Sequence, residues 1–554
     1  MKSIDSFYYK SQQSKDKFYL GMVSQVHGEN AYVQVENLSL LNHRNIGLES
    51  LFPSTINYLV LIDSVRGLFI AQVYQAKVNS SDSVHNSMNN GLKDIVYPEI
   101  GINILGILYE DENKKINRFR LSGFQTVGLT DKVYIANKDV ISIFIDSLEI
   151  NENECQDSLE NLMKVEEFDN KPISLKPNTL FDRHLMVVGT TNSGKSTSSL
   201  VILDKLISSK KKVIIIDPTG EYKESFNTEE VIKLTLGDDT SLKTDTLDID
   251  FWINFFNLSD SENSNQASVL SEAIKSLRYQ KSINQDTVLI KEGKNVSDIL
   301  QKVDSVKSKS FDLDLLSEQI RREAVKQKID RSQRVFKHDG NIFNAMLWLN
   351  QKVEYLLSTT FIKKFFKHSD CDLLEELDKF VKTTNTKSLY IDLSNISKTD
   401  RAGETVIDLI AKRLIDSKDS QNEDLQNEDL QKKSSFIFFI DEVHRYINKY
   451  KEDNGLVSIA REGRKKGIFL FLTTQSPKDV PKVLLGQIGT MIVHNLNSED
   501  EIMAIKNKLD NKYIYRIHKL NRGEAILASI NLLQDIPVYF DISKRNHNNK
   551  TKFI

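Results

Sequence analysis

Three absences narrow the class of this 554-residue chain. It has only two cysteines, Cys155 and Cys371, which lie far apart and form no C-x-x-C motif. Their scarcity excludes a disulfide framework and a cysteine zinc site, and it fits a cytoplasmic protein in a reducing compartment. No apolar run approaches the length of a membrane span, and the N-terminal residues lack the continuous apolar core of a signal peptide.

An excess of positive charge is also absent. The 74 Lys and Arg residues are balanced by 77 Asp and Glu residues, so the formal net charge is −3. A globally basic coat for nucleic acid is therefore excluded, and any DNA binding must come from a local surface such as the lining of a channel. The composition is that of a globular protein, and the length predicts two or three domains.

The first part of the chain is predicted to consist of short β-strands. Two β-prone runs flank a turn signal at 27–30, which predicts a hairpin, and the Ser- and Asn-rich stretch from Asn79 to Asn90 is expected to be a mobile loop. Many short strands separated by turns predict a small β-barrel, which we assign to residues 1–170. The β-prone runs are 18–23, 31–35, 58–62, 67–73 and 104–108.

From about residue 175 the sequence alternates between strands and helices, which indicates a parallel sheet and the α/β class. Residues 171–554 are assigned to this second domain, with a predominantly helical insertion at about 222–386 and a tail at about 540–554. The apolar periodicity of the insertion is clearest from Ile342 to Phe366, where Trp348 is grouped with the apolar positions. A polar tandem duplication at 421–431 is expected to be a surface loop. The expected strands are 185–188, 212–217, 388–393, 435–442, 467–475 and 491–494.

The most specific motif is a complete G-x-x-x-x-G-K-S phosphate loop between the first of these strands and a helix. Its glycines let consecutive backbone N–H groups face an anion, and the helix adds the positive end of its dipole. Lys195 is expected to reach the β- and γ-phosphates of ATP, and the Ser196 hydroxyl to bind Mg²⁺. The predicted nucleotide-binding residues are Gly189, Thr190, Thr191, Asn192, Ser193, Gly194, Lys195, Ser196 and Thr197.

Two acids end another apolar strand, in the manner of a Walker B motif. A continuous apolar run fits a strand buried on both faces, and its acids then lie at the carboxyl edge of the sheet, where such sheets bind ligands. Asp441 is expected to hold Mg²⁺ through water, and Glu442 to polarise the attacking water. Gln475 ends the next strand and is expected to sense the γ-phosphate, although a polar strand end without a role gives the same pattern.

Cations precede that last strand, in the segment 459–467. In multi-subunit ATPases an arginine of one subunit completes the neighbouring site by stabilising the charge on the transferred phosphoryl group. Arg464 and Arg461 are both candidates for such a trans finger, and the sequence does not separate them. A solvated basic turn is the alternative interpretation of each.

Several motifs together make the chain resemble the HerA family, a branch of the FtsK–HerA class of ring ATPases that pump DNA. The resemblance spans about 175–540 and implies a RecA-like P-loop core, while the β-rich N-terminus is similar in kind to that family's HAS barrel. One departure is Asn192, where family members often have glycine; asparagine tolerates positive φ. The motifs are FDRHL at 181–185, DPTGEY at 217–222, IDEVHR at 440–445, AREGRKKG at 460–467 and TTQSP at 473–477.

The resemblance also implies roles for three further residues. Arg183 looks like an arginine that contacts nucleotide within its own chain, and a surface salt bridge is the alternative. Asp217 and Glu221 look like a second acidic pair near the metal and the attacking water. A strand-end cap and a helix N-terminal acid are the alternatives for these two.

The function implied by the resemblance is an ATP- and Mg²⁺-dependent DNA translocase or helicase. The expected assembly is a homohexamer with nucleotide sites between subunits and DNA through a central channel. An effector protein, either a nuclease for DNA end processing or a sirtuin-like NADase for antiviral defence, is expected to dock on the N-terminal barrel. The alternative is an ATP-binding scaffold that organises and activates an effector with little translocation.

Overall fold

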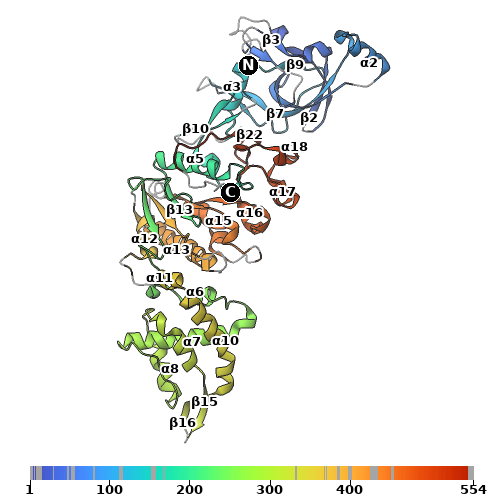
Figure 1. The fold of residues 1–554 in the computed structure, drawn as a ribbon. Helices are drawn as coiled ribbons and strands as arrows, with labels where there is room; N and C mark the ends of the chain where they lie inside the picture. The colour runs from blue at the N-terminus through green and yellow to red at the C-terminus, as the bar shows by residue number, and fades with distance from the viewer. Residues whose placement is uncertain are drawn as a thin grey trace, which may run out of the picture.

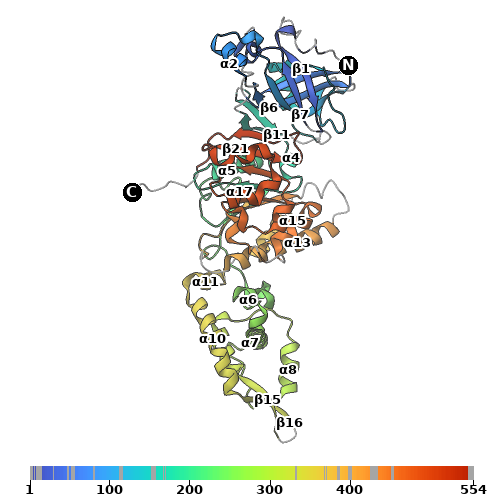
Figure 2. The ribbon, with the colours of Figure 1, turned by 90° about the vertical axis from the view of Figure 1, so that its right-hand side faces the viewer.

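A computed structural model describes most of the chain as an elongated molecule. The N-terminal β-domain, a central α/β domain and a helical module follow one another along its length (Figure 1). A view turned by 90° gives the same order, with the helical module at the end opposite the N-terminal domain (Figure 2). The described residues are 4, 7, 15–28, 30–46, 49–51, 56–78, 81–111, 116–150, 158–165, 168, 170–330, 333–366, 369, 371–383, 387–396, 402–424, 435–448, 450 and 454–546.

The N-terminal domain contains a closed barrel, as predicted. Its strands lie in the order β2-β1-β9-β5-β6-β7-β8, and a further pairing of β2 with β7 closes six of them into a ring. The expected hairpin forms from β1 and β2, with Val26 opposite Ala31. The strands are β1 (Tyr19–Val26), β2 (Asn30–Val35), β5 (Leu59–Ser64), β6 (Gly67–Lys77), β7 (Glu99–Asp111), β8 (Ile116–Arg120) and β9 (Lys132–Ile135).

The expected loop at 79–90 is instead a helix, α2 (Asp82–Asn89). The Ser81 side chain accepts a hydrogen bond from the Val84 N–H at the start of this helix. Serine at this position satisfies one of the unpaired N–H groups of a first helical turn. The loop prediction was wrong because the same Ser and Asn residues that favour loops also cap helices.

The central domain is built on a mixed sheet with the order β11-β10-β22-β21-β20-β12-β19-β18-β13-β17-β14. The strands from β20 to β14 are parallel, and those from β21 to β11 are antiparallel. The α/β prediction is thus confirmed. The parallel strands are β20 (Thr490–Val493), β12 (Leu185–Val188), β19 (Ile468–Thr474), β18 (Phe436–Ile440), β13 (Lys212–Asp217), β17 (Ser388–Asp392) and β14 (Val231–Thr235).

This strand order positions the candidate site. The strand that precedes Gln475, β19, lies between β12, which leads into the phosphate loop, and β18, which ends at the Walker B acids. Because all three strands run in the same direction, their carboxyl ends share one edge of the sheet. Three segments that are far apart in the sequence therefore converge at that edge.

Alternating side chains of β12 divide the apolar core into two clusters. Leu185 and Val187 belong to a cluster that continues into the N-terminal barrel and includes the helix α5 (Lys195–Ser208). Met186 and Val188 belong to a second cluster with α13 (Ala402–Asp424), α15 (Gly455–Lys466) and the helical module. Because side chains alternate along a strand, one face of the sheet packs toward the N-terminal barrel and the other packs toward the helical module.

Two strands join the large sheet from segments that the sequence analysis had assigned elsewhere. β10 (Leu159–Val165) pairs with β11 (Lys171–Leu175) and β22 (Ile536–Tyr539), although it precedes the predicted boundary at residue 170. β14 pairs with β17, although it lies within the segment predicted as the insertion. Both partners are non-local, and local patterns do not identify which sheet a short strand joins. The division into domains itself stays a prediction.

The helical module, residues 264–365, contains five α-helices and a β-ribbon among its described residues. A cluster of aromatic side chains around Trp252, which is fully buried, connects it to the central domain. Trp348, which the apolar periodicity of 342–366 grouped with core residues, is 76% exposed. The elements are α7 (Ser264–Ser282), α8 (Val296–Asp304), α9 (Leu316–Arg322), β15 (Val325–Asp330), β16 (Gln333–His338), α10 (Gly340–Ser358) and α11 (Thr360–Phe365).

The described part of the predicted tail is anchored. The Arg545 guanidinium bonds the carboxylates of Asp204 at 2.6 Å and Glu230 at 2.8 Å, and it lies 4.9 Å from the centre of the Phe226 ring. These contacts fix the C-terminal segment against the central domain up to that point; residues 547–554 lie outside the described residues. No described helix is long and apolar enough to cross a membrane.

Candidate nucleotide-binding site

The phosphate loop has the backbone that its sequence demands. It connects β12 to α5, with Asn192 at a φ of 65° and Gly194 at a φ of 114°. Asparagine therefore keeps the left-handed geometry that a glycine would give, as expected. Gly189 has no room for a side chain, because an added Cβ would lie 2.5 Å from the Ser193 hydroxyl oxygen and 2.7 Å from the His494 Cβ.

Segments that follow β20 and precede β21 (Glu524–Ser529) hold the outside of this loop. The Gly523 N–H donates to the Ser193 carbonyl at 3.0 Å, and the Thr190 N–H donates to the Asn495 carbonyl at 2.9 Å. His494 bonds Ser198 of α5 at 2.8 Å, and its Nδ1 lies 2.8 Å from the Glu524 carbonyl. Burial lowers the pKa of His494 to about 4, so this imidazole is neutral and serves as a structural link.

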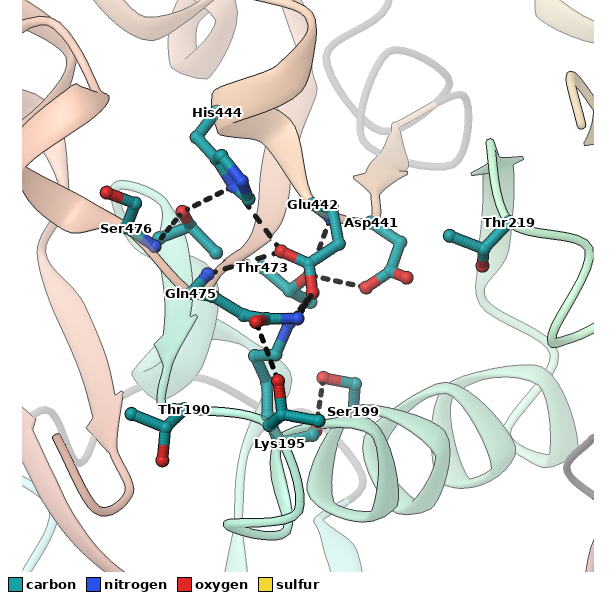
Figure 3. Close-up of polar contacts among 12 residues, drawn as sticks. Thr190, Lys195, Ser199, Thr219, Asp441, Glu442, His444, Thr473, Gln475 and Ser476 are labelled. Carbon is teal, nitrogen blue, oxygen red and sulfur yellow. Dashed lines mark hydrogen bonds and ion pairs between the residues drawn. The ribbon is translucent and has the colours of Figure 1, made fainter. Parts of the chain in front are cut away.

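The two Walker B acids occupy the end of β18, as the sequence predicted. Asp441 is 2% exposed and accepts a hydrogen bond from the Thr473 hydroxyl at 2.5 Å. Glu442 adopts a φ of 50°, a left-handed conformation that is uncommon for a residue with a long side chain. This turn directs the Glu442 carboxylate toward the phosphate loop (Figure 3).

Glu442 is the centre of a hydrogen-bonded network. Its carboxylate forms an ion pair with the Lys195 ammonium, and it accepts hydrogen bonds from the Gln475 side-chain amide at 2.5 Å and the Gln475 backbone N–H at 3.2 Å (Figure 3). The Thr191 hydroxyl donates to the Gln475 side-chain oxygen at 2.9 Å. The three predicted motifs are thus bonded to one another.

The neighbouring acids have opposite pKa shifts. Burial, together with Glu442 and Asp217, raises the pKa of Asp441 to about 6, although Lys195 opposes this. Burial also disfavours the charged form of Glu442, but the ammonium of Lys195 and the hydrogen bonds from Lys195 and Gln475 outweigh it, so the pKa of Glu442 falls. Glu442 therefore stays ionised, as a residue that polarises water requires. Burial lowers the pKa of His444, whose Nδ1 lies 3.4 Å from the Glu442 carboxylate.

A cavity of about 360 Å³ opens at this edge of the sheet. Three of its residues, Thr219, Arg445 and Arg522, were not identified from the sequence. A larger cavity of about 680 Å³ lies in the helical module, but it has neither a phosphate loop nor a converging strand edge. The smaller one is therefore the candidate nucleotide pocket. Its lining is Thr190, Thr191, Asn192, Gly194, Lys195, Ser196, Thr197, Thr219, Glu221, Glu442, Arg445, Gln475 and Arg522.

Asp217 and Glu221 differ in their surroundings. Asp217 is fully buried and accepts hydrogen bonds from the backbone N–H groups of Thr219, Gly220 and Tyr222 and from the Tyr390 hydroxyl. It thereby fixes the turn that follows β13. Glu221 belongs to that turn and lines the pocket. The strand-end role left open for Asp217 agrees with these contacts, and its place in the chemistry stays a prediction.

The three predicted arginines lie outside the lining of the pocket. Arg183 is exposed at the amino end of β12 and packs against Gly489, where an added Cβ would lie 2.9 Å from the Arg183 Cβ. Arg464 bonds Asp182 at 2.8 Å, and Arg461 is exposed on the same helix, α15. The expected contact of Arg183 with nucleotide in its own chain stays a prediction. Arg445 and Arg522 supply the additional cations in the pocket.

The fold and the pocket define an α/β P-loop protein with a Walker B acid pair. Two family models match consecutive parts of the chain: "Helicase HerA, central domain" matches residues 161–414, and "Helicase HerA-like C-terminal" matches residues 422–525. The chain belongs to the HerA helicase family. The resemblance found in the sequence motifs is thereby confirmed.

The curated relatives are distant. The chain is 24% identical over 363 residues to a probable helicase of Methanocaldococcus jannaschii, a match that covers 64% of this chain and 61% of that protein. It is 23% identical over 388 residues to the DNA double-strand break repair helicase HerA of Pyrococcus furiosus, with 65% of each covered. The chain thus spans less than two thirds of the length of these relatives.

Two solved structures resemble the fold at low scores. One is the plasmid coupling protein TrwB in complex with ADP and Mg²⁺, which is 14% identical, with 72% of this chain and 92% of that chain covered and a TM-score of 0.45. The other is VirB4 of Thermoanaerobacter pseudethanolicus, which is 13% identical, with 71% and 98% covered and a TM-score of 0.46. The fold assignment rests on the strand order described above.

Proposed function

We propose that this chain hydrolyses ATP and uses the energy to move along DNA as a translocase or helicase of the HerA type. The observation that carries the proposal is the network in which Lys195, Glu442 and Gln475 meet beside the phosphate loop. Each has the chemistry that one step requires. Lys195 is a cation for the phosphates, Glu442 is an ionised acid for water, and the Gln475 amide contacts both Glu442 and Thr191 of the phosphate loop.

The network supports a mechanism in which ATP binding breaks the Lys195–Glu442 ion pair. The γ-phosphate competes with Glu442 for the Lys195 ammonium, and its arrival frees the Glu442 carboxylate to orient and polarise water. Gln475, bonded to both Glu442 and Thr191, is positioned to report the presence or loss of that phosphate. Hydrolysis then restores the Lys195–Glu442 ion pair and releases the phosphate contacts.

A Mg²⁺ ion fits the oxygen donors near the N-terminus of α5. No group of three or more His, Cys, Asp or Glu side chains that could hold a metal occurs in the described part of the chain. Mg²⁺ instead takes few protein ligands and completes its shell with water and phosphate oxygens. The Ser196 hydroxyl and the buried Asp441 carboxylate would hold it there, and the ion would neutralise charge on the phosphates.

The proposed assembly is a homohexamer with DNA in its central channel. Arg464 and Arg461 support it, because both lie on the exposed side of α15 and outside their own pocket, where they are accessible to a neighbouring subunit. We further propose that an effector, a nuclease or an antiviral NADase, docks on the N-terminal barrel. A cytoplasmic setting, in DNA end processing or phage defence, goes with this proposal.

A second candidate, an ATP-dependent scaffold for an effector, is favoured by one observation. Glu442 is held by Lys195 and Gln475 in the single chain, so hydrolysis can depend on a signal from a neighbour or partner. The two candidates differ in strand displacement by the purified protein with ATP and Mg²⁺. Directional displacement that is lost in Glu442→Gln supports the motor, whereas ATP turnover without displacement supports the scaffold.

Deletion of the barrel tests the docking proposal separately. A chain lacking residues 1–158 is expected to keep nucleotide binding and to lose an effector that co-purifies with the full chain. Equal recovery of the effector with both chains would place its docking surface on the central domain or the tail. Nucleotide binding by the truncated chain is the control for damage to the core. This control is needed because the barrel shares an apolar cluster with β12.

A further inference from the structure

The free end of the helical module carries a β-ribbon that the nucleotide pocket does not use. β15 and β16 pair antiparallel along their whole length and join no other described strand. Every residue of β15 after Val325 is exposed. The first two and the last two residues of β16 are also exposed. Both views show the ribbon at the tip of the molecule, opposite the N-terminal domain (Figures 1 and 2).

The two faces of the ribbon differ. Phe336 is buried among Leu289, Val296, Ile299 and Val303, so its face packs against the module. Side chains alternate along a strand, and the register places Lys326 opposite Lys337 and Gln327 opposite Phe336. Lys326, Lys328 and Lys337 therefore share the face that points away from the module.

That outward face is cationic in spite of a cost. Like charges directly opposite each other destabilise an antiparallel pair, and Lys326 and Lys337 form such a pair. Lys326 has an ion pair with Asp339, and Lys337 has one with Asp330 at 2.7 Å. On this face, the contacts of the described residues include no ion pair for Lys328. Arg334 lies opposite Ile329, on the face of Phe336.

The local charge stands out against the chain as a whole. The outward face has three lysines, Lys326, Lys328 and Lys337, and one acid, Asp330, whereas the whole chain has a net charge of −3. A protein partner would require apolar anchors at the centre of its interface. On the outward face only Val335, which is opposite Lys328, is apolar. The chemistry that this face fits is a polyanion.

We propose that the β15–β16 ribbon is a docking surface for the phosphate backbone of duplex DNA. The major groove, about 12 Å wide, admits a two-stranded ribbon. Six residues per strand at about 3.3 Å each give a ribbon about 20 Å long, enough to follow several phosphates. Contacts from lysine and arginine to phosphates carry no sequence information, which suits a motor that must bind any sequence. This inference rests on the proposed function.

The test is the salt dependence of duplex binding. A labelled duplex is titrated with the full chain and with Lys328→Gln/Lys337→Gln, which removes two lysines of the outward face, at a series of salt concentrations. The double variant is expected to lower the slope of log affinity against log salt by about 2, because each phosphate contact contributes about 0.9. Its ATP turnover without DNA is expected to equal that of the wild type, because the ribbon lies far from the pocket (Figure 1).

Two matched variants keep the test decisive. Lys363→Gln/Lys364→Gln removes the same charge from exposed positions of α11, at the other end of the module, and is expected to leave the slope unchanged. Lys328→Arg/Lys337→Arg keeps the charge of the outward face and is expected to keep the slope, which separates lost contacts from a misfolded ribbon. If the neutral variant and the wild type have equal slopes, the ribbon proposal is overturned. If the wild type neither binds duplex nor gains ATP turnover from it, the proposed function itself is overturned.

Discussion

The two edges of the central sheet bury lysines in opposite ways. At the carboxyl edge, Lys195 is paired with the Glu442 carboxylate. At the amino edge, Lys212 donates to the carbonyls of Phe380 and Thr383 and lies over the Phe380 ring, while Lys418 donates to Gln421 and lies over the Phe436 ring. Burial lowers the pKa of Lys212 and of Lys418 to about 8, and Lys212 adds to the shift of Lys418.

The difference separates a site for chemistry from a structural contact. The ion pair with Glu442 compensates the charge of Lys195 and also gives this lysine an exchangeable partner, so a phosphate can take the place of Glu442. Neutral oxygens and an aromatic ring hold Lys212 without compensating its charge in full. Burial disfavours the charged form of Lys418. Removing a lysine should therefore abolish function at one edge and improve stability at the other.

The largest effect is expected from Lys195→Ala. ATP turnover should fall more than about 10³-fold, because the variant loses charge stabilisation of the transition state and leaves Glu442 buried without its counter-charge. Steady-state hydrolysis by folded protein measures the loss, with the thermal unfolding midpoint as the control for folding. Turnover near that of the wild type would remove Lys195 from the proposed mechanism.

Arg464→Ala is expected to lower turnover by about 10³-fold, at the lower end of the range for a trans arginine. Arg464 contacts Asp182 and not its own pocket, so the loss should be repaired across a subunit interface. Mixing Arg464→Ala with Lys195→Ala should restore activity, since some interfaces then combine an intact Lys195 with an intact Arg464. If Arg461→Ala gives the complementation and Arg464→Ala does not, the finger is Arg461. A mixture as inactive as its components argues against the ring.

A smaller effect, on nucleotide affinity, is expected to differ between two arginines at opposite edges of the sheet. Arg522 lines the pocket beside Gly523, which bonds the phosphate loop, whereas Arg183 is outside the pocket. Arg522→Ala is expected to weaken binding of a fluorescent ATP analogue about tenfold, the value of about 1.4 kcal/mol for a charged contact. Arg183→Ala should change the affinity less than twofold. The reverse ranking would restore the role expected for Arg183 from the family resemblance.

The residues that the sequence identified share a local signature. The phosphate loop, Asp441, Glu442 and Gln475 each follow a continuous apolar strand, so motif and context could be judged together. Parallel strands then bring them to one edge without further information. These are the residues that the structure joins in the Lys195–Glu442–Gln475 network.

What the sequence did not indicate depends on contacts between distant segments. Arg522 reaches the pocket because the Gly523 N–H bonds the Ser193 carbonyl, and no spacing in the chain predicts that bond. Gly523 has a φ of 90°, a left-handed conformation that glycine adopts readily. The sheet membership of β10 and β14 was not predicted, for the same reason. Trp348 is an error of the opposite kind. Its helical periodicity predicted a core position, but its side chain is exposed.

The smallest expected effect is a gain in stability at the amino edge. Lys418→Met keeps the length of the side chain over Phe436 and removes a charge that burial disfavours. A gain of about 1 kcal/mol at pH 7 is expected, which corresponds to an increase of a few degrees in the unfolding midpoint. Lys412→Met is the matched control, because Lys412 is an exposed lysine on the same helix, and it should change stability by less than about 0.5 kcal/mol.

The pH dependence of this gain identifies its cause. The pKa of Lys418 is about 8 in the folded chain and about 10.4 in an unfolded one, so the unfolded chain binds more protons between these values. The penalty for burying Lys418 is therefore complete below pH 8 and disappears as the pH rises toward 10.4. The stability difference between Lys418→Met and the wild type should shrink over that interval, followed by thermal unfolding. A difference that is the same at pH 7 and pH 10 would mean that packing, not desolvation of the ammonium, sets the stability of this edge.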